Sequence, residues 1–180
     1  MLATKGIDIK GKTVAVSGFG NVSWGTVQKL NQLGAKVITI SGPDGYILDE
    51  ECVSGEKEAY MLELRASGKN IVAPYAEKFP NAKFFPGKKP WEVKADVYIP
   101  CATQNEIDVP EAEKIVANGI KYYVEVSNMP TTNEAVAYLK KNGVIVAPSK
   151  AVNAGGVAVS GLEMSQNSMR YSWSAEEVDA

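Results

Sequence analysis

A glycine-rich turn between an apolar strand and a helix constrains the fold of this chain more than any other feature of its sequence. The β-branched and apolar run Thr13 to Ser17 leads directly into Gly18-Phe19-Gly20-Asn21-Val22-Ser23, and a helical pattern continues to Leu33. A strand, a tight turn and a helix with the spacing Gly-x-Gly-x-x-small form the fingerprint of a dinucleotide pyrophosphate site. The sequence therefore predicts a pyrophosphate-binding turn at this point.

Each small residue of the turn has its own expected role. Gly18 permits the sharp turn out of the strand, and Gly20 has no Cβ to keep the phosphates away from the main chain. Ser23 replaces the third glycine of the fingerprint and is small enough for close packing of the helix on the strand. The free N–H groups of the first helical turn then face the anion. A glycine-rich turn that serves only the geometry of the chain is the alternative.

The composition of the chain is typical of a soluble globular protein. It has 180 residues, 45% of them hydrophobic and 22% charged, with a net charge of -2. This length predicts one domain, and no basic run is long enough to indicate a nucleic-acid partner. The apolar runs are strand-sized, so we expect no membrane span, and the first five residues lack the apolar core of a signal peptide. The expected location is the cytoplasm.

The residue types that are scarce also restrict the chemistry. Histidine is absent and there are two cysteines, Cys52 and Cys101. We expect both cysteines to be reduced thiols and expect no metal site. The absence of histidine excludes imidazole acid-base catalysis and histidine-based triads from this chain.

Alternating strand and helix patterns predict an α/β fold of the doubly wound Rossmann type, one dinucleotide-binding domain over residues 1–180 with a mostly parallel sheet and helices on both faces. The expected strands are 13–17, 36–40, 83–85, 95–100, 121–126 and 144–147, and the expected helices are 21–33, 56–65, 71–79, 110–118, a helix ending at 141, and 157–169.

The end of the second strand is where such folds recognise the adenosine ribose. Ser41 or Gly42 occupies that position, and the first carboxylate, Asp44, comes slightly later in Gly42-Pro43-Asp44-Gly45. Asp44 is either a ribose contact or a plain turn residue. NAD is the favoured cofactor, with NADP possible.

Polar residues follow the remaining strands, at the edge of the sheet where ligands bind. Ala102, Thr103, Gln104 and Asn105 follow one strand, Asn128 follows the next, and Asn153 follows the last. An amide side chain both donates and accepts hydrogen bonds, which suits a nicotinamide carboxamide and ribose hydroxyls. Three asparagines at successive strand ends therefore favour a ligand over simple turn formation.

Three further segments carry expectations of their own. The loop Gly87-Lys88-Lys89-Pro90 is interpreted as a solvated basic face, with a phosphate contact as the alternative. Thr131 and Glu134 are expected to form a capping box for the helix ending at Lys141. Ser174 and Glu177 form a second such pattern with too little sequence after it for a stable helix, so we expect the chain to be a piece of a longer protein.

The sequence closely resembles the cofactor-binding domain of the hexameric, bacterial-type glutamate dehydrogenases along nearly its whole length. The stretches that carry the resemblance are SGFGNVSWG (17–25), GPDGY (42–46), CATQNEI (101–107), SNMPTT (127–132) and PSKAVNAGGVAVSG (148–161). The last of these is specific to the family and is not explained by a generic Rossmann domain.

The resemblance implies a role for particular residues. Asn21 and Val22 would lie at the pyrophosphate turn, and Gln104, Asn105 and Asn128 along the nicotinamide half of the cofactor. Asn153 would border the nicotinamide. Val157 and Ser160 would reach the substrate's side chain and distal carboxylate.

The resemblance also implies an activity for the parent enzyme, and it implies that the catalytic residues lie outside this chain. The parent enzyme would interconvert L-glutamate with 2-oxoglutarate and ammonia, with hydride transfer to or from the nicotinamide, as a homo-hexamer. The family's catalytic lysine and aspartate belong to an N-terminal substrate domain, so we expect no catalytic residue in this chain and no activity from it alone. A stand-alone nucleotide-binding sensor and the cofactor domain of a related amino-acid dehydrogenase are the alternatives.

Overall fold

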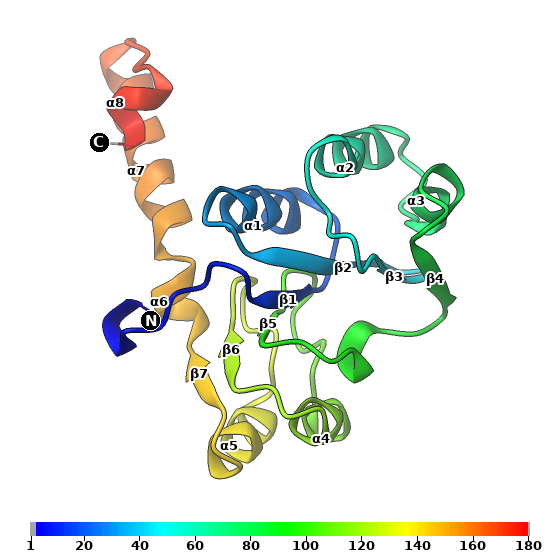
Figure 1. Cartoon of the computed structure of the whole chain (residues 1–180). Coiled ribbons are helices and arrows are strands. Elements are labelled where there is room, and N and C mark those ends of the chain that lie inside the picture. The colour runs from blue at the N-terminus through cyan, green and yellow to red at the C-terminus, as the bar shows by residue number, and fades with distance from the viewer. Residues whose placement is uncertain (1–2, 180) are drawn as a thin grey trace.

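The computed structural model describes residues 3–179 and contains one seven-stranded sheet in the order β4-β3-β2-β1-β5-β6-β7 (Figure 1). β1 pairs in parallel with β2 and β5, and β5, β6 and β7 continue the parallel part. The strands are β1 (Thr13–Val16), β2 (Lys36–Gly42), β3 (Gly45–Leu48), β4 (Lys83–Pro86), β5 (Val97–Ile99), β6 (Tyr122–Val124) and β7 (Ile145–Ala147).

Helices cover both faces of the sheet, as the sequence predicted. Figure 1 shows α1 and α2 on one side and α4 and α5 on the other, while α7 extends away from the sheet. The helices are α1 (Asn21–Gln32), α2 (Glu56–Ala66), α3 (Ala73–Lys78), α4 (Val109–Ala117), α5 (Asn133–Lys141), α6 (Ser149–Val152), α7 (Ala154–Met169) and α8 (Ala175–Asp179), with short 3-10 turns η1 (Ala3–Lys5) and η2 (Pro90–Glu92).

Alternation along the central strand explains the two-sided core. Val14 and Val16 of β1 belong to the buried cluster under α1, whereas Ala15 between them belongs to the cluster under α4 and α5. Successive side chains of a strand point to opposite faces, so a strand buried on both faces is a continuous apolar run. The run Thr13 to Ser17 has this character because β1 lies in the middle of the sheet.

The segment between β2 and α2 differs from the prediction. Gly42 to Gly45 closes a hairpin, and β3 pairs antiparallel with both β2 and β4. Gly45 is required here, since its φ is +152° and a Cβ would lie 2.3 Å from the carbonyl oxygen of Phe85. Tyr46 stacks on Phe85 across β3 and β4 with ring centroids 4.7 Å apart. The prediction of six strands was therefore wrong by one, because no strand was predicted directly after the turn that ends at Gly45.

The helix caps correct a second prediction. Thr132, and not Thr131, caps α5 by accepting a hydrogen bond from the Ala135 amide, while the Thr131 hydroxyl bonds the buried Tyr123 hydroxyl at 2.7 Å. The pair expected before α8 is confirmed, since Ser174 and Glu177 exchange reciprocal hydrogen bonds.

Helix α7 also begins earlier than predicted, at Ala154 instead of Val157, and none of its residues is buried. The prediction of two unpaired cysteines agrees with the structure, in which Cys52 and Cys101 are both free. Within residues 3–179 no helix is both long enough and apolar enough to cross a membrane.

Candidate functional site

The turn after β1 is held by close contact with the end of β5. Gly18 has a φ of +82°, and a Cβ on it would lie 2.9 Å from the Cys101 carbonyl oxygen and 3.2 Å from the Ala102 Cα. Its amide donates to the Ser41 hydroxyl at 2.9 Å. Glycine is needed at this position because the main chain of the segment that follows β5 occupies the place of a side chain.

The next glycine faces open space instead. Gly20 precedes α1 with ordinary angles, φ −75° and ψ −168°, and a Cβ on it would meet no atom within 4 Å. Neither a side-chain cap nor any other acceptor within residues 3–179 bonds the amides of Gly20, Asn21 and Val22. Phe19 is 6% exposed and belongs to the buried cluster under α1. The first turn of α1 therefore offers free N–H groups to an anion.

Ser23 performs more than the expected packing role. It is fully buried, and its hydroxyl donates to the Gly18 carbonyl oxygen at 2.9 Å. The serine that replaces the third glycine of the fingerprint therefore ties the start of α1 to the end of β1.

Two adjacent hollows lie along the carboxyl edge of the sheet and have Ala102 in common. The first, of about 230 Å³, is lined by Gly18, Phe19, Gly20, Ser41, Gly42, Pro43, Asn70, Lys89, Cys101, Ala102 and Thr103. The second, of about 750 Å³, is lined by Val22, Ala102, Gln104, Val126, Ser127, Asn128, Met129, Ser149, Lys150, Asn153, Gly156, Val157 and Ser160. Eleven of the fourteen predicted site residues line one hollow or the other.

The three asparagines at the strand ends have different surroundings. Asn153 donates from Nδ2 to Oδ1 of Asn128 at 2.7 Å, so these two are brought together in the larger hollow. Asn105 has a φ of +52°, and its amide donates to the carbonyl oxygen of Met129. Asn105 therefore joins the loop after β5 to the loop after β6 and lines neither hollow.

The remaining two predicted residues are engaged by neighbouring elements. Asn21 accepts a hydrogen bond from the Arg65 guanidinium of α2. Both carboxylate oxygens of Asp44 accept from the amide of Val72 at 3.0 Å, and one also accepts from Ala73, so that Asp44 caps α3. The predicted ribose contact of Asp44 stays a prediction.

Sequence reasoning gave too little weight to Lys89. Its ammonium donates to the Gly42 carbonyl oxygen at 2.8 Å and lines the hollow beside the two glycines of the turn. Lys89 is thus a cation at the predicted pyrophosphate end of the site, and the phosphate contact of the loop 87–90 stays a prediction. The basic residues of this loop were visible in the sequence, but the order of the residues did not show that the loop lies next to Gly42.

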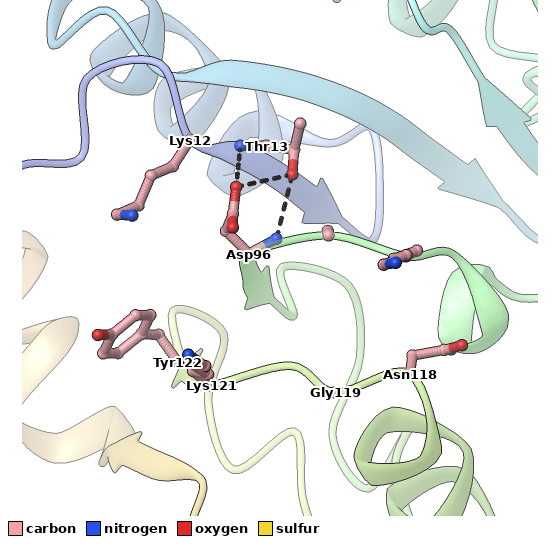
Figure 2. A pocket seen from close by; sticks show the side chains of 9 residues that line it. Lys12, Thr13, Asp96, Asn118, Gly119, Lys121 and Tyr122 are labelled. Carbon is pink, nitrogen blue, oxygen red and sulfur yellow. Dashed lines mark hydrogen bonds between the residues drawn. The ribbon is translucent and has the colours of Figure 1, made fainter.

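A third hollow, of about 460 Å³, lies at the opposite, amino edge of the sheet (Figure 2). There the Asp96 carboxylate accepts from the amide and the hydroxyl of Thr13, which joins the beginnings of β1 and β5. None of the predicted site residues lines it, and ligands of parallel sheets bind at the carboxyl ends of the strands. We therefore place the candidate site at the carboxyl edge.

Within residues 3–179 no three histidine, cysteine or acidic residues gather as metal ligands do.

Comparison with known proteins is consistent with the fold described above. The model of the Glutamate/Leucine/Phenylalanine/Valine dehydrogenase family matches residues 1–180. The chain is 63% identical over 179 residues to the NAD-specific glutamate dehydrogenase of Bacteroides fragilis, covering 99% of this chain and 40% of that protein. It is 47% identical over 180 residues to the NADP-specific glutamate dehydrogenase of Escherichia coli, covering 100% of this chain and 40% of that protein.

Solved structures give the same result. The chain superimposes on a glutamate dehydrogenase with a TM-score of 0.94 at 60% identity, covering 99% of this chain and 40% of that one. The Plasmodium falciparum glutamate dehydrogenase gives a TM-score of 0.92 at 41% identity, with 99% and 38% covered. The chain thus spans about 40% of the length of the relatives it matches.

Proposed function

We propose, since this chain belongs to the glutamate/leucine/phenylalanine/valine dehydrogenase family, that it supplies the NAD(P)-binding part of a glutamate dehydrogenase. The parent enzyme would interconvert L-glutamate with 2-oxoglutarate and ammonia. The observation that carries this proposal is the turn at Gly20, where three main-chain amides without partners border an open space beside α1. A diphosphate fits such a turn because the amides and the helix dipole both favour an anion.

The two hollows divide the proposed cofactor between them. The smaller hollow, with Gly18, Ser41 and Lys89, would hold the pyrophosphate and the adenosine side. The larger hollow would hold the nicotinamide, where Asn128 and Asn153 offer amide groups that already bond each other. When bound, the nicotinamide supplies the hydride chemistry, and the protein's part is to fix its position.

The substrate side of the proposal rests on α7. Val157 and Ser160 line the larger hollow on the same helix, three residues apart and therefore on one face. Ser160 would donate a hydrogen bond to the distal carboxylate of glutamate, and Val157 would contact the substrate's methylene groups. A serine at this position favours a substrate with a polar end over the apolar amino acids that other members of the family use.

The cofactor preference and the assembly are part of the same proposal. We propose NAD as the preferred cofactor and NADP as possible, in keeping with the relatives named NAD-specific at 63% identity and NADP-specific at 47%. The catalytic lysine and aspartate would come from a substrate domain outside this sequence, so the chain would be inactive without it. We further propose a homo-hexamer and a cytoplasmic location for the parent.

Titration with NADH and NADPH tests the proposal, with the fluorescence of Trp24 and Trp91 as the signal. Trp24 is the fourth residue of α1 and its amide donates to the Gly20 carbonyl oxygen, so a diphosphate bound at the start of α1 should change its emission. Gly20→Val should abolish the response, because the side chain would fill the open space beside the amides.

Gly25→Ala is the matched control, since a Cβ on Gly25 also meets no atom within 4 Å but lies within α1, away from its free amides. This variant should bind as the wild type does. A wild-type protein that responds to neither nucleotide would overturn the proposed function, and so would a Gly20→Val variant that binds normally.

A further inference from the structure

Glu106 lies behind the predicted cofactor loop, and neither hollow is lined by it. Its Oε1 accepts a hydrogen bond from the Ser17 hydroxyl at 2.9 Å and a longer one from the Ala102 amide at 3.3 Å. The Ser17 hydroxyl in turn accepts from the Cys101 amide at 3.0 Å. One carboxylate oxygen thus connects the end of β1 to Cys101 and Ala102, the second and third residues after β5.

This connection lies beside a close main-chain contact between the segment after β1 and the segment after β5. Gly18 follows Ser17, and its Cα approaches the main chain of Cys101 and Ala102 so closely that a methyl group has no room. Ala102 is the residue that both hollows have in common. The place of the loop 102–105 relative to the free amides of α1 therefore depends on how Ser17 and Glu106 hold its beginning.

Besides Lys89, Glu106 has three titratable neighbours, and burial raises the pKa of each of these three groups. Burial raises the pKa of Glu106, while its two hydrogen bonds and the Lys89 ammonium oppose that rise. Burial also raises the pKa of Cys101 to about 12 and keeps those of Tyr98 and Tyr123 well above their usual value. Between pH 5 and 8 these three neighbours stay protonated.

We infer that Glu106 is a positioning residue for the cofactor: its carboxylate, acting through Ser17 and the Ala102 amide, holds the loop 102–105 where cofactor binding requires it. A charged acceptor binds these donors more strongly than a neutral one. Cofactor affinity should therefore fall as Glu106 becomes protonated. The inference rests on the proposed function, and one of its two tests needs no cofactor.

The first test measures hydrogen exchange of the Cys101 and Ala102 amides in the absence of nucleotide. In Glu106→Ala the Ser17 hydroxyl and the Ala102 amide lose their acceptor, so exchange should become about tenfold faster, as expected for the loss of one hydrogen bond. Glu106→Gln keeps an oxygen at the same place and should remain within about twofold of wild type. Glu113→Gln is the matched control, because Glu113 is an exposed glutamate of α4.

The second test measures the NADH dissociation constant from pH 5.5 to 8. Glu106→Ala should bind NADH about tenfold more weakly at pH 8, and Glu106→Gln about two- to threefold more weakly, as expected for a neutral acceptor in place of a charged one. Wild type should lose affinity as the pH falls and Glu106 gains a proton, whereas Glu106→Gln should lose much less because it has no proton to gain.

The two tests separate this inference from the proposed function. Wild type that binds no NADH overturns the proposed function, whatever the exchange result. Unchanged exchange in Glu106→Ala overturns the positioning role, and so does a wild-type pH profile that persists in Glu106→Gln. If Glu106→Ala fails to fold, Ser17→Ala breaks the same connection, and unchanged exchange at Ala102 in that variant would refute the inference equally.

Discussion

Gly18 and Gly20, two residues apart in one turn, should respond in opposite ways to the same added methyl group. In Gly18→Ala the Cβ would lie 2.9 Å from the Cys101 carbonyl oxygen and 3.2 Å from the Ala102 Cα, and both of these are main-chain atoms that cannot rotate away. The residue must also keep a φ near +82°, which costs a residue with a Cβ about 1–2 kcal/mol. Forcing the two strand ends apart adds about 1–3 kcal/mol.

The expected loss for Gly18→Ala is therefore about 2–5 kcal/mol of unfolding free energy. Gly20→Ala should change the unfolding free energy by no more than about 0.5 kcal/mol, because its angles suit alanine and the space around it is open. Urea unfolding followed by far-UV circular dichroism measures both, with the wild-type slope as the reference for two-state behaviour.

The same pair should separate stability from binding. Gly20→Ala should remain as stable as wild type while NADH binding weakens, since its methyl group enters the space proposed for the diphosphate. A Gly18→Ala variant within 1 kcal/mol of wild type would refute the argument from close contact, and so would equal destabilisation of the two variants.

Three further changes have definite expected outcomes. Asp44→Ala should cost about 1 kcal/mol because α3 loses its cap, and an unchanged ratio of NAD to NADP affinity would leave Asp44 without a role at the ribose. Ser23→Ala should cost about 1 kcal/mol in urea unfolding, since the Gly18 carbonyl oxygen loses one of its two donors and keeps only the Ser41 amide. Glu106→Gln should become more stable relative to wild type as the pH rises above the usual value of 4.5, because burial raises the pKa of Glu106 and the folded state then disfavours its charged form. A stability difference between Glu106→Gln and wild type that does not change with pH would contradict this assignment.

The turn after β1 was predictable from sequence because its cause is local. A strand, two glycines and the start of a helix are consecutive in the chain, and each position has a conformational reason for its residue type. The predicted doubly wound topology was correct for the same reason, since each crossover is a run of neighbouring elements. The sequence could also place Asn128 and Asn153 at the same edge, because parallel strands end together.

Side-chain contacts between distant segments were not predictable in this way. The hairpin of β2 and β3 was missed because the sequence of Gly42 to Gly45 predicts a turn whether or not a strand follows. The strand that follows also pairs with β4, and this contact between distant segments is not visible in the sequence. Asp44 has the residue type of a ribose contact, yet its carboxylate caps a helix that begins 29 residues later. The role of Glu106 depends on Ser17, 89 residues earlier in the chain.

Short buried hydroxyl side chains form hydrogen bonds with main-chain groups where β1 diverges from β2 and β5 at the carboxyl edge of the sheet. The register of β1 against β2 shifts between Val14 and Ala15, and beyond it the Thr39 hydroxyl both accepts from the amide of Val16 and donates to its carbonyl oxygen, at 2.9 Å each. The Ser41 hydroxyl then accepts from the Gly18 amide, and the Ser17 hydroxyl accepts from the amide of Cys101, the second residue after β5. An unpaired buried amide would cost about 1–3 kcal/mol, so these hydroxyls stabilise the strand ends where they diverge. The free amides of α1 lie next to strand ends whose own amides are bonded by these hydroxyls, which leaves the amides of α1 as the donors available to an anion.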